Sequence, residues 1–393
     1  MRYRRFGRTE LTMPVFSCGG MRYQHKWQDV PESEIPEDGQ RNLEATIWRA
    51  IDLGIHHIET ARGYGTSEMQ LGRILPTLPR EKLIVQTKVI PGPDPNAFRQ
   101  TFEKSLAYLK LDYVDLLGLH GINTPELLQD SVRPGGCLEV ARSLQAEGKV
   151  RFIGFSTHGP TDVIVQAIET DQFDYVNLHW YYINQSNWPA IEAATRHDMG
   201  VFIISPSNKG GMLYEPSQRL VDLCAPLSPL VFNNLFCLSH PQVHTLSVGA
   251  ARPGDFDEHL KTLDLLDQAH EVLAPIVERL EDALIDCLGE NWVRTWYLGL
   301  PAPHETPGGL NIHTMLWLWN LAKAYDLVEY GKMRYNLLGN GGHWFPGARA
   351  DRLQDLDFRN CLKNSPHADQ IPAILQETHD LLGSQPVKRL SQS

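Results

Sequence analysis

The sequence of 393 residues has few cysteines, no long apolar run and no excess of positive charge. Its six cysteines are scattered, with no C-x-x-C pair, which favours reduced thiols in a cytoplasmic protein over a disulfide framework. No window of about eighteen residues is both apolar and uncharged, and the basic N-terminal segment lacks the apolar stretch of a secretory signal, so we expect neither a membrane span nor export. The formal net charge of −11 argues against nucleic acid and anionic membranes as partners.

The chain also lacks the G-x-G-x-x-G loop that usually follows the first strand of a doubly wound open sheet, since Cys-Gly-Gly-Met at 18–21 leads into a polar stretch. After an N-terminal segment with hairpin-like alternation, short apolar runs alternate with helix-length amphipathic segments, which predicts a parallel sheet covered by helices. The eight runs are VFSCGG, IHHIET, KLIVQTKV, YVDLLGLH, RFIGFST, DYVNLHW, GVFIISP and HTLSVGA. Eight such units in about 250 residues favour an α/β fold, the (β/α)8 TIM barrel, over the open sheet.

The pattern changes after residue 268. Residues 267–289, 313–339 and 371–383 each have the character of a helix, and the stretches between them are irregular and rich in proline and glycine. We therefore predict two domains, a barrel over 1–268 and a smaller, mostly helical C-terminal domain over 269–393. The last residues, 386–393, are expected to form a loose tail.

Polar residues stand where three consecutive predicted strands end. Glu59 closes the second run and Tyr64 follows in its loop, Lys88 lies near the end of the third run, and His120 closes the fourth. Taken singly, each has an ordinary structural explanation, such as a loop aromatic, a solvated strand end or an ion-pair partner. Active sites of TIM barrels lie at the carboxyl ends of the strands, so the joint placement favours a catalytic group.

These four residues have a common chemical logic. A phenol titrates near pH ~10 and is a weak acid at neutral pH, but an adjacent ammonium favours the phenolate and lowers its pKa. A lysine in a dry pocket needs a carboxylate partner, which Glu59 can supply to Lys88. Because a neutral histidine can orient a carbonyl oxygen, the set predicts an acid, Tyr64, that protonates an oxygen while a nucleophile attacks the carbon.

Motifs in the first 265 residues carry a resemblance to a known family. They are RRFGRTELTMPVFSCGGMR, IETARGYGTSE, VQTKV, VDLLGLHG, KVRFIGFSTH, FIISPSNKGG and VGAARPGDFDEH. In this order, at strand ends, they resemble the aldo-keto reductase superfamily. That resemblance implies a (β/α)8 barrel that binds NADPH, or sometimes NADH, without a Rossmann motif and reduces aldehydes and ketones by hydride transfer.

The same resemblance implies roles for the residues at the strand ends. Tyr64 would be the general acid, Lys88 the group that modulates its pKa, and His120 the group that orients the carbonyl. Glu59 would pair with the lysine, although the family usually has aspartate at this position. The charge is kept, but the side chain is one methylene longer, and small displacements at a site cost rate heavily.

The resemblance also implies a cofactor site along the remaining strand ends. Ser156, Thr157 and Asn177 would contact the nicotinamide amide, and the loop with Ser205, Ser207, Lys209 and Gly210 would cradle the pyrophosphate. The adenosine-phosphate region would contain Gly249, Arg252, Asp255, Glu258 and His259. Arg252 suits a 2′-phosphate and favours NADPH, but it also suits a solvated helix start. Asp255 and His259 depart from the family's usual residues, so NADH stays open as well.

The C-terminal part resembles a subgroup whose barrel is followed by a ferredoxin-like domain. The similar stretches are GGLNIHTMLWLWNLAKAYDLVEYGKMRYNLL and IPAILQETHDLL. In that subgroup the irregular stretches carry C-x2-C-x2-C-x3-C-P, the ligand run of a [4Fe–4S] cluster. Here the cysteines are missing, so we expect a degenerate ferredoxin-like domain with no iron–sulfur cluster and no other metal. It would act as a cap over the barrel or as a surface for a protein partner.

The resulting hypothesis is an NADPH-dependent carbonyl reductase, an oxidoreductase of the aldo-keto type acting on a small-molecule carbonyl substrate. Two alternatives stay open. One is an NADPH-binding regulatory or scaffold protein with little or no turnover, which Glu59 and the lost cysteines motivate. The other is a lyase or isomerase without a nicotinamide, against which the loop SPSNKGG argues.

Overall fold

The computed structural model describes residues 1–386, so most of the predicted tail, 387–393, lies outside the described residues. The chain divides into two compact units. The barrel unit consists of Met1–Gly210 and Asn233–Ala269, and the helical unit consists of Gly211–Phe232 and residues 270–386. The sequence-based division at 268/269 assigns the segment 211–232 to the barrel, whereas in the structure this segment is part of the helical unit.

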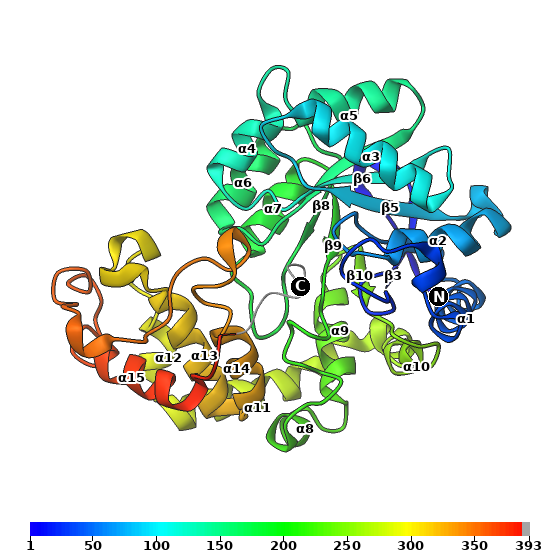
Figure 1. Cartoon of the computed structure of the whole chain (residues 1–393). Helices are drawn as coiled ribbons and strands as arrows, with labels where there is room; N and C mark the ends of the chain where they lie inside the picture. Colours follow the sequence, from blue (N-terminus) through cyan, green and yellow to red (C-terminus); the bar gives the residue numbers. More distant parts are fainter. Residues whose placement is uncertain (387–393) are drawn as a thin grey trace. The chain divides into compact units, whose positions relative to one another are not determined.

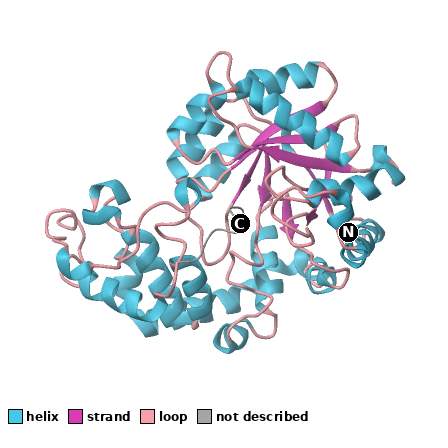
Figure 2. Cartoon of the chain, viewed as in Figure 1, coloured by secondary structure: helices cyan, strands magenta, loops and turns pink. Residues whose placement is uncertain are grey.

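The barrel unit is built on eight parallel strands that close on themselves in chain order, with β10 beside β3. Figure 2 shows these strands surrounded by helices. The predicted TIM barrel is therefore confirmed, and each of the eight apolar runs supplies one strand. The strands are β3 (Phe16–Gly19), β4 (His57–Glu59), β5 (Ile84–Val89), β6 (Val114–His120), β7 (Val150–Ser156), β8 (Tyr175–Leu178), β9 (Gly200–Ile203) and β10 (Thr245–Val248). The expected N-terminal hairpin is also present, as β1 (Tyr3–Arg5) paired antiparallel with β2 (Thr12–Pro14).

Helices follow the strands of the barrel (Figure 1). They are α1 (Glu37–Asp52), α2 (Ser67–Ile74), α3 (Pro95–Leu109), α4 (Pro125–Val132), α5 (Cys137–Ala146), α6 (Thr161–Glu169), α7 (Trp188–Arg196) and α10 (Asp255–Leu260). Local sequence sets their ends, as α3 shows. Asp94 accepts a hydrogen bond from the amide of Asn96 at 2.9 Å, Pro95 occupies the first turn, and Lys110 ends the helix with a φ of 54°.

Strand register brings the polar strand ends to one rim. Glu59 pairs with Gly19 on β3 and with Gln86 on β5. Lys88, two residues after Gln86 on β5, pairs with Gly118. His120 pairs with Ser156, which in turn pairs with Asn177. Because all eight strands are parallel, the residues at their carboxyl ends face the same end of the barrel.

The helices of the helical unit are α8 (Gln218–Cys224), α11 (Ala269–Leu288), α12 (Glu290–Thr295), α13 (Ile312–Tyr325), α14 (Val328–Tyr335) and α15 (Ile371–Leu382). The residues of α9 (Pro229–Leu238) are divided between the two units after Phe232. The run 313–339 forms two helices, α13 and α14, because Asp326 takes a left-handed conformation with φ of 55° and ends the first of them. Ser217 ties the segment 211–232 to α13 by donating to the carbonyl of Tyr325 at 2.7 Å.

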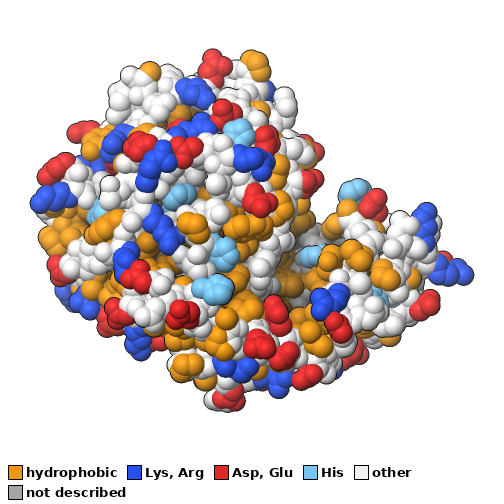
Figure 3. All heavy atoms as spheres, turned by 180° about the vertical axis from the view of Figure 1, so that it is seen from behind, with side chains coloured by type: hydrophobic (Ala, Val, Ile, Leu, Met, Phe, Trp, Pro, Cys, Tyr) orange, Lys and Arg blue, Asp and Glu red, His pale blue; other side chains and the backbone are white. Residues whose placement is uncertain are grey.

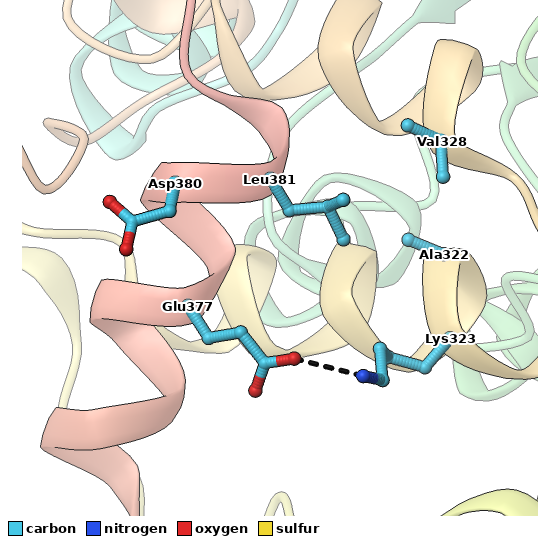
Figure 4. Close-up of a pocket in the computed structure, with 6 residues that line it drawn as sticks. All are labelled: Ala322, Lys323, Val328, Glu377, Asp380 and Leu381. Atoms are coloured by element: carbon cyan, nitrogen blue, oxygen red, sulfur yellow. Dashed lines mark hydrogen bonds and ion pairs between the residues drawn. The ribbon is translucent and has the colours of Figure 1, made fainter.

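Aromatic side chains fill the interior of the helical unit. The indole of Trp292 donates to Asn320 at 2.8 Å and packs against Trp319 and His367. Figure 4 shows side chains that line a hollow on this unit, among them Lys323 and Glu377. The hollow has a volume of about 540 Å³, and these two residues form an ion pair at 2.9 Å. This hollow contains none of the predicted site residues.

Acidic and basic side chains are interspersed over the face shown in Figure 3. Within residues 1–386 no single helix is long and apolar enough to cross a membrane. The bent pair α8 and α9 reaches the required length and composition only when both helices are taken together.

Candidate active site

Tyr64 lies in a tight turn between β4 and α2. Its amide donates to the carbonyl of Ala61 at 3.0 Å, and its own carbonyl accepts from the amide of Ser67 at 3.1 Å. Gly65 has a φ of +54°, and a Cβ at this position would lie 1.9 Å from the carbonyl oxygen of Lys26. A glycine is therefore required after the tyrosine, both for the backbone conformation and for the covering segment.

Lys88 and Glu59 form a buried ion pair at the rim, with only 1% and 4% of their side chains exposed. The ammonium also donates to the carbonyl of Thr60 at 2.7 Å. Burial lowers the pKa of Lys88 well below its usual range, and the carboxylate in contact with it acts in the opposite direction by favouring the ammonium. Glu59 thus reaches the lysine despite its additional methylene.

Tyr64 stands between the other predicted catalytic residues. The ammonium nitrogen of Lys88 lies 4.8 Å from the centre of the Tyr64 ring, and the His120 ring meets the same phenol edge-to-face at 5.8 Å. His120 is 8% exposed. The structure therefore brings all four predicted residues together, with a cation and an imidazole against one phenol.

The next two strand ends present an amide without a partner. Both side-chain polar atoms of Asn177 are buried and have no hydrogen-bond partner among the described residues. Ser156, its strand neighbour, is also buried and accepts from the amide of Gly121 at 3.3 Å. Thr157 differs, because its hydroxyl donates to the carbonyl of Ile122 at 2.7 Å and so serves the loop. A free carboxamide buried at the rim suits a ligand with its own amide, since unpaired buried polar groups are costly.

The loop after β9 has the conformation of a narrow cradle. Ser205 has a φ of +55°, its carbonyl accepts from the amide of Lys209 at 2.9 Å, and a Cβ on Gly210 would lie 2.1 Å from the carbonyl of Pro206. The hydroxyl of Ser207 is buried without a partner in the described part of the chain. Such a loop, with a lysine beside it, suits an anionic group.

Two histidines that the sequence reasoning missed meet this lysine. The ammonium of Lys209 donates to Nε2 of His179 at 3.1 Å and lies 3.4 Å from the ring nitrogens of His158. Nδ1 of His179 then donates to the hydroxyl of Tyr181 at 2.5 Å, which donates in turn to the carbonyl of Ile204. The only sequence signal for this cluster was that each histidine follows a strand.

The residues after β10 are divided between the surface and the core. Asp255 is 10% exposed, accepts from the amide of Ala251 at 2.8 Å and pairs with Arg252 at 3.0 Å, while Arg252 is 79% exposed. Glu258 pairs with Lys261 at 2.5 Å. The structure therefore leaves Arg252 as a surface cation whose charge is partly offset by Asp255.

His259 and Gly249 occupy the inner side of the same region. His259 is buried, accepts from the side-chain amide of Asn234 at 2.9 Å, and has its pKa lowered to about 4 by burial. Arg22, which the sequence reasoning did not select, donates to the carbonyl of Gly249 at 2.7 Å and lies 3.7 Å from Asp255. A second cation therefore stands beside the loop after β10.

The aromatic residues after β8 belong to the core. Trp180 and Tyr181 are each 1% exposed, and Trp180 stacks on Phe236 at 5.0 Å and packs on Trp188 at 5.3 Å. Trp180 and Tyr181 are therefore packed in the interior and do not line an open pocket.

Comparison with solved structures shows the same fold. An aldo-keto reductase from Klebsiella pneumoniae in complex with NADPH superposes with a TM-score of 0.55 over 70% of this chain and 95% of that one, at 21% sequence identity. At this level of identity the likeness concerns the fold.

Sequence comparison extends this to two curated relatives. The chain is 26% identical over 162 residues to the NADH-specific methylglyoxal reductase of Escherichia coli, and 37% identical over 134 residues to the L-galactose dehydrogenase of Arabidopsis thaliana. These matches cover 36% and 32% of this chain, and 48% and 41% of the relatives. The chain thus spans about half the length of the curated relatives it matches. The sequence profile of the "Aldo/keto reductase family" matches residues 16–219, and the chain belongs to that family.

Proposed function

We propose that this chain is an NADPH-dependent reductase of aldehydes and ketones, with Tyr64 as the general acid. The observation that carries the proposal is the position of the Lys88 ammonium, 4.8 Å from the centre of the Tyr64 ring and paired with Glu59. A positive charge at this distance favours the phenolate and so makes the phenol a better acid at neutral pH.

The polar groups at the rim fit the parts of the dinucleotide. Ser156 and Asn177 would hold the nicotinamide carboxamide, with Thr157 shaping the loop beside them. Ser205, Ser207, Lys209 and Gly210 would hold the pyrophosphate. The adenosine-phosphate region would be formed by Gly249, Arg252, Asp255, Glu258 and His259. When bound, the dihydronicotinamide supplies a hydride to the carbonyl carbon.

The protein's own residues complete the reaction at the oxygen. His120 orients the carbonyl oxygen toward the phenol, and Tyr64 gives its proton to that oxygen, which becomes the alcohol. The Lys88 ammonium stabilises the phenolate left on Tyr64, and Glu59 keeps the lysine charged although it is buried. Positioning of this kind accounts for much of the rate that such sites supply.

Cofactor choice and substrate size are further parts of the proposal. Arg252 is largely exposed and Arg22 stands near the same loop, and both cations favour NADPH with its 2′-phosphate. The pairing of Arg252 with Asp255 weakens that preference, so NADH is the second candidate. The methylglyoxal reductase and an L-glyceraldehyde 3-phosphate reductase of Escherichia coli, which is 28% identical over 176 residues, support small carbonyl compounds as substrates.

We further propose that the C-terminal domain, 269–393, keeps a ferredoxin-like framework without its cluster and serves as a cap or a partner surface of a cytoplasmic protein. Four thiolates are needed for a [4Fe–4S] cluster. Between residues 270 and 386 the chain has only Cys287 and Cys361. Among the described residues no group of three or more histidines, cysteines or carboxylates could hold a metal ion.

The test begins with binding. Purified protein is titrated with NADPH and separately with NADH while tryptophan fluorescence is followed, and tight binding of NADPH with quenching is the expected result. Turnover of methylglyoxal and other small carbonyls is then followed by the loss of NADPH absorbance. Tyr64→Phe should keep the binding and lower kcat by about 10²–10⁴-fold.

A second candidate is an NADPH-binding scaffold protein with little turnover. The observation that favours it is Glu59, where the family usually has aspartate. It predicts that NADPH binds but that Tyr64→Phe changes no measurable rate. Binding of neither dinucleotide would overturn both candidates.

A further inference from the structure

A network of paired charges, buried at Glu68 and open to solvent at its outer edge, flanks the turn that carries Tyr64. At its centre is Arg62, two residues before the phenol, with 13% of its side chain exposed. We propose that Arg62 and Glu68 are positioning residues that hold Tyr64 against Lys88, an inference that rests on the proposed function.

Arg62 is attached to both sides of the site. Its backbone amide donates to the carbonyl of Lys88 at 2.9 Å, which ties the start of the turn to β5. Its guanidinium pairs with Glu68 on α2 and donates to the carbonyl of Gly65 at 3.1 Å. The turn from residue 62 to residue 68 is therefore closed on itself across Tyr64, and a planar guanidinium is the group best suited to several directed contacts.

Glu68 extends the same connection to the strand that carries the lysine. Its carboxylate is fully buried, and Oε1 accepts from the hydroxyl of Thr87 at 2.6 Å. Thr87 directly precedes Lys88 on β5. Burial raises the pKa of Glu68, whereas the charge of Arg62 acts in the opposite direction and favours the carboxylate. Two separate paths, one through backbone and one through side chains, thus join the tyrosine turn to the lysine.

Asp29 holds the network from the outside. It pairs with the guanidinium of Arg62, and it also accepts from Lys104 at 2.7 Å and from the hydroxyl of Tyr108 at 3.1 Å. The segment that leads to Asp29 covers the turn, because the carbonyl of Lys26 accepts from the amide after Gly65, that of Thr66, at 2.9 Å.

These contacts restrain the one geometric relation on which the acid depends. Arg62 is hydrogen-bonded to Gly65, which follows Tyr64, and to Glu68. Glu68 is hydrogen-bonded to Thr87, which precedes Lys88. Displacing a catalytic group by about 1 Å can lower the rate by about 10²-fold, so loosening the network should act on chemistry more than on cofactor binding.

The chain provides a matched control at the opposite end of the barrel. Asp115, at the start of β6, is fully buried and pairs with Arg80 at 2.7 Å and with Arg151 at 2.6 Å. This arrangement has the same chemistry, an arginine paired with a buried carboxylate, but it lies away from the carboxyl ends of the strands, where Tyr64 and Lys88 are found. Asp115→Asn should lower the melting temperature and leave kcat and the titration of Tyr64 as in wild type.

The experiment compares Glu68→Gln with Asp115→Asn in the full chain. For Glu68→Gln we expect kcat with a small carbonyl to fall about 10–100-fold while the Kd of NADPH changes less than about threefold. The phenol of Tyr64 is titrated by ultraviolet absorbance, as the difference between each protein and its Tyr64→Phe counterpart. It should titrate at higher pH in Glu68→Gln, because the phenol has moved away from the lysine charge while His120 and Glu59 remain.

A second variant covers the case in which Glu68→Gln does not fold. Thr87→Val removes only the hydroxyl between Glu68 and β5, and it should shift the same titration in the same direction by a smaller amount. The inference is wrong if Tyr64 titrates as in wild type in these variants, or if Asp115→Asn moves it equally. This readout needs no turnover, so it distinguishes failure of the positioning role from failure of the reductase proposal, which shows as a wild type inactive on every carbonyl tested.

Discussion

Replacing Glu59 by glutamine tests whether the buried ion pair keeps Lys88 charged. The variant Glu59→Gln retains the size and one hydrogen-bonding oxygen of the side chain but removes its charge. Lys88 is 1% exposed, so water cannot replace the lost carboxylate. In the folded variant Lys88 either stays charged without a partner or releases its proton, and both states raise the free energy of the folded protein.

The two outcomes give similar magnitudes. An ammonium left buried without its partner costs about 3–5 kcal/mol. If Lys88 instead releases its proton, the cost at pH 7 is the difference between lysine's ordinary pKa of about 10.4 and the pH, multiplied by about 1.36 kcal/mol, or about 4.6 kcal/mol. We therefore expect the variant to lose about 3–5 kcal/mol of unfolding free energy at pH 7, a fall in melting temperature of roughly 6–20 °C for a barrel of this size.

The pH dependence of this loss identifies its cause. If Lys88 is neutral in the folded variant, the unfolded chain binds a proton that the folded chain does not, and the stability of the variant rises with pH by about 1.4 kcal/mol per unit up to lysine's ordinary pKa. If Lys88 stays charged, the loss does not depend on pH in this range. In the first of these cases the melting temperatures of wild type and variant should converge between pH 7 and pH 9. The double variant Glu59→Gln/Lys88→Met, which removes both charges, should be more stable than Glu59→Gln alone. A deficit below about 1 kcal/mol at pH 7, unchanged at pH 9, would refute the reasoning.

Three further predictions concern the turn and the cofactor site. Gly65→Ala should lower the free energy of unfolding by more than the ~1–2 kcal/mol that a left-handed conformation costs, because the new methyl group also meets the carbonyl of Lys26. The control Gly39→Ala, where a Cβ has no atom within 4 Å, should not lower the melting temperature. Asn177→Ala should raise the Kd of NADPH and NADH equally, by about 3–10-fold in fluorescence titrations, and unequal changes would contradict a contact with the nicotinamide. Arg252→Ala should weaken NADPH about 3–10-fold and leave NADH unchanged, and equal effects would exclude a 2′-phosphate contact.

The barrel and the rim could be predicted from the sequence because a parallel barrel places its strand ends by topology alone. Once the apolar runs are assigned to strands, Glu59, Lys88 and His120 must come to the same end, whatever the side chains do in between. The position of Tyr64 followed from the loop beside them. These predictions depended on the fold and needed no side-chain detail.

Other features depended on contacts that no local pattern encodes. His158 and His179 reach Lys209 from different strands, and Arg22 reaches Gly249 from the opposite end of the barrel unit's sequence. The break between α13 and α14 falls at Asp326, without the glycine or proline that usually marks a helix end. The contacts of His158, His179 and Arg22 are tertiary, whereas the helix break is a local left-handed turn at an aspartate.

The pairing of β10 with β3 has a consequence for folding during synthesis. Strands β4, β5 and β6, which carry Glu59, Lys88 and His120, are synthesised early and pair with one another in chain order. The hydrogen bond from Arg22 to Gly249 cannot form until a partner 227 residues later has been synthesised. Contacts so distant in sequence carry a large loop-closure entropy and form late. A nascent chain therefore contains its proposed catalytic residues long before the barrel can close. The loop after β10, where the adenosine phosphate is proposed to bind, is the last part of the rim to be completed.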